Sequence, residues 1–368
     1  MERLNWHIAD ELARYADVRL IGPIGCARER PKSVEVDEVP LRPLWRFLQA
    51  SAWKAVRTAR VWKPQLVLAG SGLTAPAAWV AARVASARAG VYLHGLDVAV
   101  RHPIYQALWY PAMRKIDCVI ANSHATAKLT EAIGVDTGRL KIIHPGVALP
   151  GSPQEPEVLE DFRRRHKLGD ARILLSVGRL TSRKGLLEFV EQSLPSIVQN
   201  APDTLLVVIG AAPSDSLYAE AQTLNNIQAT ADGAGIGGHL RFLGVITDPV
   251  ELACAYESAS VHVFPVRNLP GDPEGFGMVA IEAAAHGVPT VAFATGGIVD
   301  AVAPDTSGYL IPSGDYRTFA QAVVHALAEG RARWQGTAQA FAQGFSWPNF
   351  GERLYSALAE TARSQSNE

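Results

Sequence analysis

Short apolar runs alternate with helical stretches along nearly the whole chain, and no other feature limits the fold as strongly. Four of these runs precede a break rich in proline and glycine at residues 145–156, and five follow it. They lie at residues 65–69, 90–93, 118–121, 141–143, 173–177, 204–209, 240–242, 261–266 and 290–293. Strands that alternate with helices build parallel sheets through βαβ units, and a Pro/Gly cluster is typical of a linker. We therefore predict an α/β protein with two Rossmann-like domains facing a central cleft, in which ligands bind at the carboxyl ends of the strands.

Composition excludes several classes of protein. A chain of 368 residues with 48% apolar residues is long enough for two globular cores. No apolar run reaches the roughly 18 residues that a membrane-spanning helix needs. The three cysteines, Cys26, Cys118 and Cys254, are odd in number and far apart. Such spacing predicts buried thiols rather than a disulfide framework or a metal cluster.

Charge is distributed unevenly along the chain. Residues 1–150 carry 20 Lys and Arg against 12 Asp and Glu, whereas the remainder carries 15 against 24. No acid occurs at residues 39–96, and the segment 42–63 combines basic residues with Trp45, Trp53 and Trp62. A basic, aromatic-rich helix is typical of proteins that bind an anionic membrane surface, so we predict a cytoplasmic protein at the inner face of the cell membrane. A surface helix with snorkelling basic side chains is the alternative. No nucleic-acid partner is predicted, because nothing else in the sequence supports base recognition.

Two carboxylates stand eight positions apart around a glycine-rich loop. Glu274 is followed by Gly275-Phe276-Gly277, and Glu282 lies in a small, apolar, helix-prone run at residues 278–285. Glycines allow the backbone to approach a ligand closely, and the first amides of a helix attract phosphate groups. Glu282 is expected about one turn inside that helix, on the same face as Met278. The pattern predicts a nucleotide-sugar site in which one carboxylate holds sugar hydroxyls and the other holds ribose hydroxyls.

Several further motifs occur together with this pair in one enzyme family. The segment from Glu274 to Glu282 resembles the Glu-x7-Glu signature of retaining glycosyltransferases of the GT-B fold, in the large family 4. The other matching segments are His94-Gly95, Asn122-Ser123, and residues 143–147, 176–180, 183–185 and 241–244. The resemblance implies an N-terminal acceptor-binding Rossmann-like domain at residues 1–147 and a C-terminal nucleotide-sugar-binding Rossmann-like domain at residues 148–344. It also implies that a helix within residues 345–368 crosses back to the N-terminal domain.

The resemblance further implies the chemistry of the leaving group. The residues expected to be catalytic are His94, Arg179, Lys184 and Glu274. Arg179 and Lys184 follow the predicted strand at residues 173–177, where two cations can neutralise a departing diphosphate. Because the chain has no Asp-x-Asp metal motif, we expect a metal-independent hexosyltransferase with no cofactor. By resemblance, the reaction is a front-face displacement that retains the anomeric configuration, and no protein nucleophile is assigned.

Substrate contacts are assigned on the same basis. In related enzymes a histidine at the position of His94 lies near the donor sugar, and Asp97 is a candidate for orienting the acceptor. The expected substrate-binding residues are Gly178, Phe242, Leu243, Phe276, Gly277, Met278, Val279, Glu282 and Asn122. Arg183, beside Lys184, is not assigned a role.

The identity of the donor and acceptor stays open at this point. Enzymes that use GDP-mannose, UDP-glucose or UDP-N-acetylglucosamine share these motifs, and the general resemblance favours GDP-mannose. The basic-aromatic segment favours a glycan or lipid-linked acceptor of envelope polysaccharide or glycolipid assembly. A catalytically inert nucleotide-sugar-binding protein is one alternative.

A nucleotide-cofactor oxidoreductase is a remote alternative, suggested by one loop. Residues 70–75 read Gly-Ser-Gly-Leu-Thr-Ala and fit the loose dinucleotide fingerprint G-x-G-x-x-A. The nearest downstream acid is Asp97, farther away than the usual spacing of about 20 residues. We therefore interpret the loop as a close-packed turn from strand to helix.

The N-terminus predicts a missing element. Leu4, Ile8 and Leu12 recur at helical spacing, and residues 18–22 resemble a second strand. Members of the resembled family have a strand and a Gly-Gly loop before this helix. The resemblance therefore implies that the first N-terminal strand is absent from this sequence, and we expect the natural protein to begin upstream of Met1.

Overall fold

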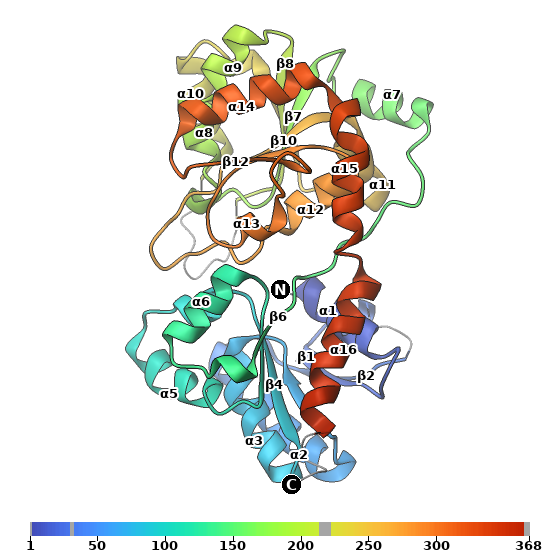
Figure 1. Cartoon of the computed structure of the whole chain (residues 1–368), viewed down its shortest axis with the longest axis vertical. Coiled ribbons are helices and arrows are strands. Elements are labelled where there is room, and N and C mark those ends of the chain that lie inside the picture. Colours follow the sequence, from blue (N-terminus) through green and yellow to red (C-terminus); the bar gives the residue numbers. More distant parts are fainter. Residues whose placement is uncertain (1, 30–32, 213–221, 364–368) are drawn as a thin grey trace. The chain divides into compact units, whose positions relative to one another are not determined.

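The chain forms two compact units in a computed structural model that describes residues 2–29, 33–212 and 222–363 (Figure 1). The N-terminal unit contains Met1–Gly146 together with Trp347–Glu368, and the C-terminal unit contains Val147–Ser346. The last segment of the chain therefore belongs to the same unit as the first.

The main sheet of the N-terminal unit is parallel. Its strands, in spatial order, are β3 (Leu66–Ala69), β4 (Arg88–Leu93), β5 (Cys118–Ala121) and β6 (Leu140–Ile142). Two further strands, β1 (Arg19–Pro23) and β2 (Glu35–Val39), form a separate parallel pair. The central strands β4 and β5 are buried almost throughout, as expected when helices cover both faces of a parallel sheet. Within the described ranges, β3 pairs only with β4.

Helices from both ends of the chain surround this sheet. They are α1 (Glu2–Leu12), α2 (Leu44–Trp62), α3 (Ala75–Ala85), α4 (Leu96–Ala99), α5 (Pro103–Met113), α6 (His124–Ala132) and α16 (Trp347–Arg363). Helix α1 buries Leu4 and Ile8, which share one helical face, and it packs against α16. The His7 ring stacks on Trp347 with 3.7 Å between ring centroids. Helix α16 thus completes the N-terminal unit (Figure 1).

The sheet of the C-terminal unit has the strand order of a doubly wound fold. Its parallel strands, in spatial order, are β9 (Leu240–Gly244), β8 (Thr204–Ile209), β7 (Arg172–Val177), β10 (Ala259–Phe264), β11 (Thr290–Phe293) and β12 (Gly308–Ile311). The chain therefore builds the sheet from the middle outwards, first to one side and then to the other. The order reverses between β7 and β10, and ligands of such sheets bind beside the carboxyl ends of the strands at this switch point.

Helices cover both faces of this second sheet. They are α7 (Pro156–Arg165), α8 (Leu186–Gln192), α9 (Leu194–Asn200), α10 (Leu224–Gly233), α11 (Pro249–Ser258), α12 (Met278–Ala285), α13 (Ile298–Ala301), α14 (Tyr316–Glu329) and α15 (Arg331–Gln343). In β7, Leu174 belongs to one buried cluster, whereas Ile173 and Leu175 belong to another. Alternate residues of a strand point to opposite faces, so these clusters are the two cores on either side of the sheet.

The predicted strands are all present, each within two residues of its expected bounds. The helices expected from Leu4, Ile8 and Leu12 and from residues 278–285 are also confirmed, as α1 and α12. Sequence analysis missed β2, in which three of the five residues are acids, and β12, which has only four residues. The strand expected upstream of Met1 concerns residues outside this sequence and stays a prediction.

Candidate active site

A cluster of opposite charges lies at the switch point of the C-terminal unit. Arg183 and Lys184 lie in the short turn η4 (Ser182–Lys184) that follows β7, and Glu274 lies in the loop that follows β10. The Lys184 Nζ atom lies 2.8 Å from Glu274 Oε2, and the Arg183 guanidinium contacts the same oxygen. Arg183 Nε also lies 3.1 Å from Asp272 Oδ1. Ion pairs therefore join the loops that follow the two strands at which the order reverses.

These charges are largely removed from water. The exposed fractions of the side chains are 10% for Arg183, 17% for Lys184 and 12% for Glu274. Burial alone raises the pKa of Glu274, but the facing Lys184 and Arg183 outweigh it and bring that pKa below its ordinary value. Burial lowers the pKa of Lys184, and the Glu274 carboxylate offsets part of this effect. Glu274 is therefore ionised at neutral pH.

A glycine brings the two loops within reach of each other. Gly185 has a φ angle of +69°, and a Cβ atom there would lie 2.2 Å from the carbonyl oxygen of Pro265. An L side chain is strained at this φ angle, and the space for it is filled by backbone. The close approach lets the Arg267 N–H donate to the Arg183 carbonyl oxygen at 2.8 Å. The backbone thus fixes the position of Arg183 and Lys184 beside the loop that carries Glu274.

The loop that follows β11 also contacts the loop of Glu274. The Gly297 N–H donates to the Glu274 carbonyl oxygen at 2.9 Å. A Cβ atom at Gly297 would lie 2.0 Å from the Gly275 carbonyl oxygen, and one at Gly296 would lie 2.5 Å from that of Glu274. Gly277, with a φ angle of +90°, then begins helix α12. Gly296 and Gly297 therefore allow the contact between the two loops, and helix α12 begins four residues after Glu274.

In the N-terminal unit, His94 follows the carboxyl end of β4. Its Nε2 atom lies 2.8 Å from the carbonyl oxygen of Gly70. A carbonyl only accepts hydrogen bonds, so Nε2 carries the proton and Nδ1 is the acceptor of the neutral ring. The His94 main-chain N–H donates to Asp97 Oδ2 at 2.9 Å. Burial lowers the pKa of His94, and the Asp97 carboxylate opposes this effect only in part. The imidazole is therefore neutral at neutral pH.

Family models match both parts of the chain. The model described as Glycosyl transferases group 1 matches residues 158–341, and the model described as Glycosyltransferase Family 4 matches residues 1–149. The chain belongs to the group 1 glycosyltransferases. The family that the motifs resemble is thus confirmed.

Solved structures share the fold of this group 1 glycosyltransferase over nearly its whole length. HepE of Anabaena in complex with UDP-glucose has a TM-score of 0.76 at 19% identity, covering 99% of this chain and 95% of that chain. A glycosyltransferase of Rickettsia africae has a TM-score of 0.80 at 19% identity, covering 98% and 94%. The fold is GT-B with two Rossmann-like domains, as predicted.

Two curated relatives carry named activities. A GDP-mannose-dependent alpha-(1-6)-phosphatidylinositol monomannoside mannosyltransferase of Mycolicibacterium smegmatis is 29% identical over 210 residues, which are 56% of this chain and 52% of that protein. A D-inositol 3-phosphate glycosyltransferase of Geodermatophilus obscurus is 33% identical over 257 residues, which are 67% of this chain and 53% of that protein. The chain spans about half the length of the curated relatives it matches.

Of the residues predicted to be catalytic in this glycosyltransferase, the structure brings Lys184 and Glu274 into direct contact. Arg179, also after β7, is exposed, and its charge contributes to the lowered pKa values of both Lys184 and Glu274. Gly178, before it, has a φ angle of +146°. His94 lies in the other unit.

Glu282, the second carboxylate of the signature, is held by a neighbouring helix. It lies about one turn inside α12, as expected. The Tyr256 hydroxyl, from α11, donates to Glu282 Oε2 at 3.0 Å, and the Tyr256 ring stacks on His286. Tyr256 therefore fixes the orientation of Glu282, whose contact with ribose stays a prediction.

Several predicted substrate-binding side chains also pack in or against the core, and their contact with substrate stays a prediction. Phe276 is buried in a cluster with Phe264, against which Met278 and Val279 also pack. Near the end of β9, Phe242 packs against one core of the sheet and Leu243 against the other. Adjacent side chains of a strand point to opposite faces, so a ligand shared by Phe242 and Leu243 would be bound by their main chain.

Two N-terminal loops have packing roles. Asn122 is buried, its Oδ1 accepts from the Thr126 hydroxyl at 2.7 Å, and its carbonyl oxygen lies 3.0 Å from His144 Nδ1. Its contact with substrate stays a prediction. A Cβ atom at Gly72 would lie 2.5 Å from Met113 and 2.7 Å from Asp97. The Gly-x-Gly loop is therefore a close-packed turn, as interpreted from the sequence.

Sequence analysis missed Arg183 and Asp272. Arg183 is among the few buried charged residues, and it binds both Asp272 and Glu274. Asp272, two positions before Glu274, was the signal in the sequence that could have indicated this cluster. Two carboxylates in one loop can neutralise two adjacent cations in another, here Arg183 and Lys184.

Helix α2 carries the basic-aromatic segment. Trp45, Trp53 and Val61 are exposed. The guanidinium of Arg46 lies over the Trp45 ring, and that of Arg57 lies over the Trp53 ring. Lys54, included in the predicted membrane-binding set, instead lies 2.9 Å from Asp37 of β2. In the part of the chain that the structure describes, no helix combines the length and apolarity needed to span a bilayer.

Proposed function

We propose that this protein is a retaining hexosyltransferase that moves a hexose from a nucleotide sugar to a glycan or lipid-linked acceptor in envelope polysaccharide or glycolipid assembly. The observation that carries the proposal is the buried contact of Glu274 with Lys184 and Arg183 at the switch point of the C-terminal sheet. GDP-mannose is the favoured donor, because a relative is a GDP-mannose-dependent enzyme. The HepE complex with UDP-glucose makes UDP-glucose the main competitor.

The diphosphate of the donor is proposed to lie at the N-terminus of α12. Unpaired amides and the positive end of the helix dipole attract phosphate there. Lys184 bears three N–H groups, so it can bind Glu274 and still donate to a diphosphate oxygen. Arg179, exposed beside it, adds a second cation. Negative charge that grows as the diphosphate departs is thereby stabilised by groups already in place.

Glu274 is proposed to orient the sugar. Its Oε2 receives both Arg183 and Lys184, and no described residue donates to Oε1. Oε1 is thus available to accept from a sugar hydroxyl. A carboxylate held by two cations is a weak nucleophile, since its basicity is lowered. This supports front-face displacement with retention over a covalent intermediate on Glu274. Glu282 is proposed to hold ribose hydroxyls and His94 to face the donor sugar.

Metal independence is proposed on the basis of the same cluster. Lys184, Arg179 and the α12 amides supply the positive charge that a divalent cation supplies in other transferases. Transfer is expected to continue in excess EDTA. Loss of activity in EDTA with recovery in manganese would contradict this part of the proposal.

The membrane part of the proposal rests on α2. Exposed tryptophans beside arginines suit the interface of an anionic bilayer, where a lipid-linked acceptor is found. We propose that the protein lies at the cytoplasmic face of the cell membrane through this helix.

A nucleotide panel tests the donor. GDP, UDP, GDP-mannose, UDP-glucose and UDP-N-acetylglucosamine are added separately, and thermal unfolding is followed. A ligand at 100 times its dissociation constant stabilises by roughly 2.7 kcal/mol. The ligand that shifts unfolding is then used in a transfer assay, with the anomeric configuration of the product read by NMR. Absence of a shift with every nucleotide would favour a protein without donor binding, and an inverted product would exclude retention.

A further inference from the structure

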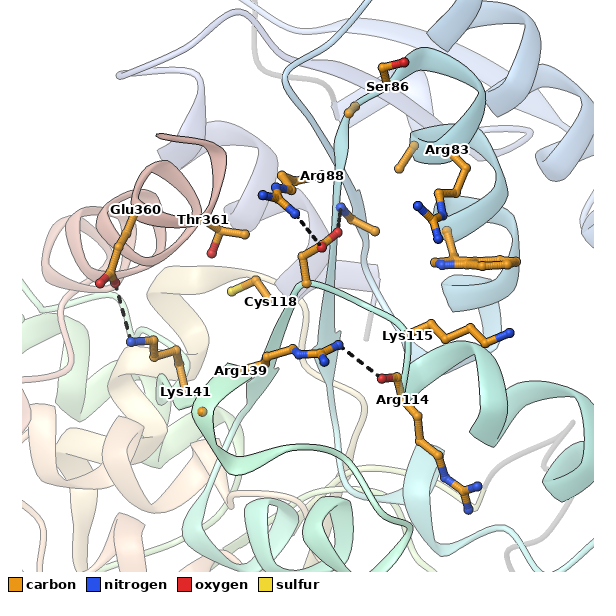
Figure 2. Close-up of a pocket in the computed structure, with 16 residues that line it drawn as sticks. Arg83, Ser86, Arg88, Arg114, Lys115, Cys118, Arg139, Lys141, Glu360 and Thr361 are labelled. Carbon is orange, nitrogen blue, oxygen red and sulfur yellow. Dashed lines mark hydrogen bonds and ion pairs between the residues drawn. The ribbon is translucent and has the colours of Figure 1, made fainter. Parts of the chain in front are cut away.

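A second charged site lies at the opposite end of the N-terminal sheet from His94. A cavity of about 980 Å³ opens beside the amino ends of β4, β5 and β6 and the C-terminal ends of α3, α5 and α16 (Figure 2). Because β4 has six residues that rise about 3.3 Å each, the cavity lies roughly 20 Å from His94. It is therefore separate from the predicted catalytic end of this unit.

The cavity is strongly basic. Six of its sixteen lining residues are Arg or Lys, and two are Asp or Glu. The basic residues are Arg83, Arg88, Arg114, Lys115, Arg139 and Lys141. Arg88 lies 3.2 Å from Asp117, and Lys141 lies 3.4 Å from Glu360. Across residues 2–29, 33–212 and 222–363, no carboxylate lies within ion-pair distance of Arg83, Arg114 or Lys115, so positive charge remains in excess.

Neutral partners hold these unpaired cations in place. The Arg83 guanidinium lies 5.8 Å and the Lys115 ammonium 5.1 Å from the centre of the Trp79 ring. Arg114 Nε donates to the Ile133 carbonyl oxygen at 2.5 Å. Arg139 is not unpaired: its Nε lies 3.6 Å from Asp136 Oδ2, and its Nη1 donates to the Arg114 carbonyl oxygen at 3.4 Å. Figure 2 shows Arg83 and Lys115 on one side of the cavity and Lys141 on the other. Arg83, Arg114 and Lys115 are thus positioned without being neutralised by a carboxylate of the described residues.

The ends of α3 and α5 explain why the fold tolerates this charge. The C-terminus of a helix carries partial negative charge and stabilises a nearby cation by about 0.3–1 kcal/mol. Arg83 lies in the last turn of α3, and Arg114 and Lys115 directly follow α5. Stabilisation by helix ends does not explain why a cavity is present, however. The cavity has the volume of a small-molecule site.

We propose that this cavity binds a soluble polyanion that carries two or more phosphate groups. Guanidinium groups bind phosphate oxygens through paired N–H donors, and several cations spread around one cavity match several phosphates better than one. The phosphates belong either to a free oligophosphate or to a phosphodiester-linked glycan chain. The proposal is independent of the proposed transferase function, because it uses no residue of the C-terminal unit.

Calorimetry on the full chain tests the site with inorganic tripolyphosphate and with a glycerol-phosphate oligomer. Arg179→Ala/Lys184→Ala removes two donor-site cations and serves as the background. In this background tripolyphosphate is expected to bind, and Arg114→Gln/Lys115→Gln is expected to weaken it by roughly tenfold or more, because two charge-assisted contacts are lost. Arg101→Gln/Lys128→Gln removes two exposed charges of the same unit outside the cavity and is expected to change affinity less than about twofold.

The outcomes separate the proposal from its competitors. Loss of all binding in the background variant would place the phosphates in the donor site alone, and equal weakening by the control pair would indicate general charge attraction. Binding to anionic vesicles that Arg114→Gln/Lys115→Gln weakens, without binding to either phosphate probe, would assign the cavity to a membrane surface; each result would overturn the proposal. The probe that binds more tightly identifies the source of the phosphates.

Arg83→Gln, at the exposed end of α3, repeats the test if the double variant unfolds. If Arg114→Gln/Lys115→Gln still shows the shift in thermal unfolding on adding nucleotide, its loss of phosphate binding has no bearing on the proposed transferase function.

Discussion

The two basic clusters of this protein use the same residue types in opposite ways. At the switch point of the C-terminal unit, Arg183 and Lys184 bind a carboxylate, and all three side chains are at least four-fifths buried. In the cavity of the N-terminal unit, Arg83 and Lys115 lie against an indole ring and stay exposed. Buried, paired charges act on a ligand through fixed geometry, whereas exposed, unpaired charges attract anions from solution and are screened by salt.

Removing Lys184 tests the paired cluster and has the largest expected effect. Lys184→Ala should lower turnover by roughly 10² to 10³, the scale for loss of one preorganised donor in the transition state. Lys128→Ala, an exposed lysine of α6, is the control and should leave turnover unchanged. Steady-state kinetics with the donor found in the panel provide the measurement. Unaltered turnover in Lys184→Ala would remove its role at the leaving group.

A buried histidine beside the paired cluster should make stability depend on pH. His262 of β10 is buried, and burial together with the Lys184 charge lowers its pKa from 6.5 to about 3. Between these values the unfolded chain binds a proton that the folded chain does not, so stability should fall as pH falls from 6.5 towards 3. His262→Gln should make this decline shallower.

Urea unfolding at several pH values measures the contribution of His262. His102→Gln, at an exposed position, is the matched control and should keep the wild-type decline. An identical slope in His262→Gln would show that other groups govern acid stability. Glu274 acts with the same sign, because its lowered pKa gives stability that is present above the ordinary value of 4.5 and is lost as pH falls through the lower folded-state pKa.

A single methyl group should disturb the loops that hold the paired cluster. In Gly297→Ala the new Cβ would meet the Gly275 carbonyl oxygen at 2.0 Å, so one loop must move. We expect a loss of roughly 1–3 kcal/mol in the free energy of unfolding, the usual cost of overpacking. Gly238→Ala, with no atom within 4 Å of the added Cβ, is the control. Equal denaturation midpoints for both variants would mean that the loops are not tightly coupled.

The fold and the paired cluster differ in how far the sequence predicts them. Continuous apolar runs suffice to predict strands such as β8 and β11, because these strands are buried on both faces. Strand β2 escapes this rule, since three of its five residues are acids and four of the five are at least partly exposed. The Pro/Gly break suffices to predict the linker between the two domains. The family motifs indicate Lys184 and Glu274 but not their direct contact.

Side-chain partners account for what the sequence does not predict. A Gly-Gly pair such as Gly296-Gly297 allows a close approach without specifying the neighbour, and the structure shows that the neighbour is the loop of Glu274 and Gly275. Lys54 is a basic residue of α2 like Arg57, yet its Nζ atom is bound to Asp37 of β2. The basic cavity is also invisible in the sequence, because its six cations come from separate segments that meet only at one end of the sheet.

The smallest expected effect concerns α2, where Arg57 and Lys54 form a matched pair. Arg57 is exposed over the Trp53 ring, whereas Lys54 is bound to Asp37. Each basic residue near an anionic bilayer contributes about 1 kcal/mol, so Arg57→Gln should weaken binding to anionic vesicles roughly fivefold. Lys54→Gln should weaken it less, because its charge is already compensated. Vesicle co-sedimentation at low and high salt measures both, and high salt should narrow the difference as exposed charges are screened. Equal binding to neutral and anionic vesicles, or an equal loss in the two variants, would mean that the unpaired charges of α2 do not direct this protein to a membrane.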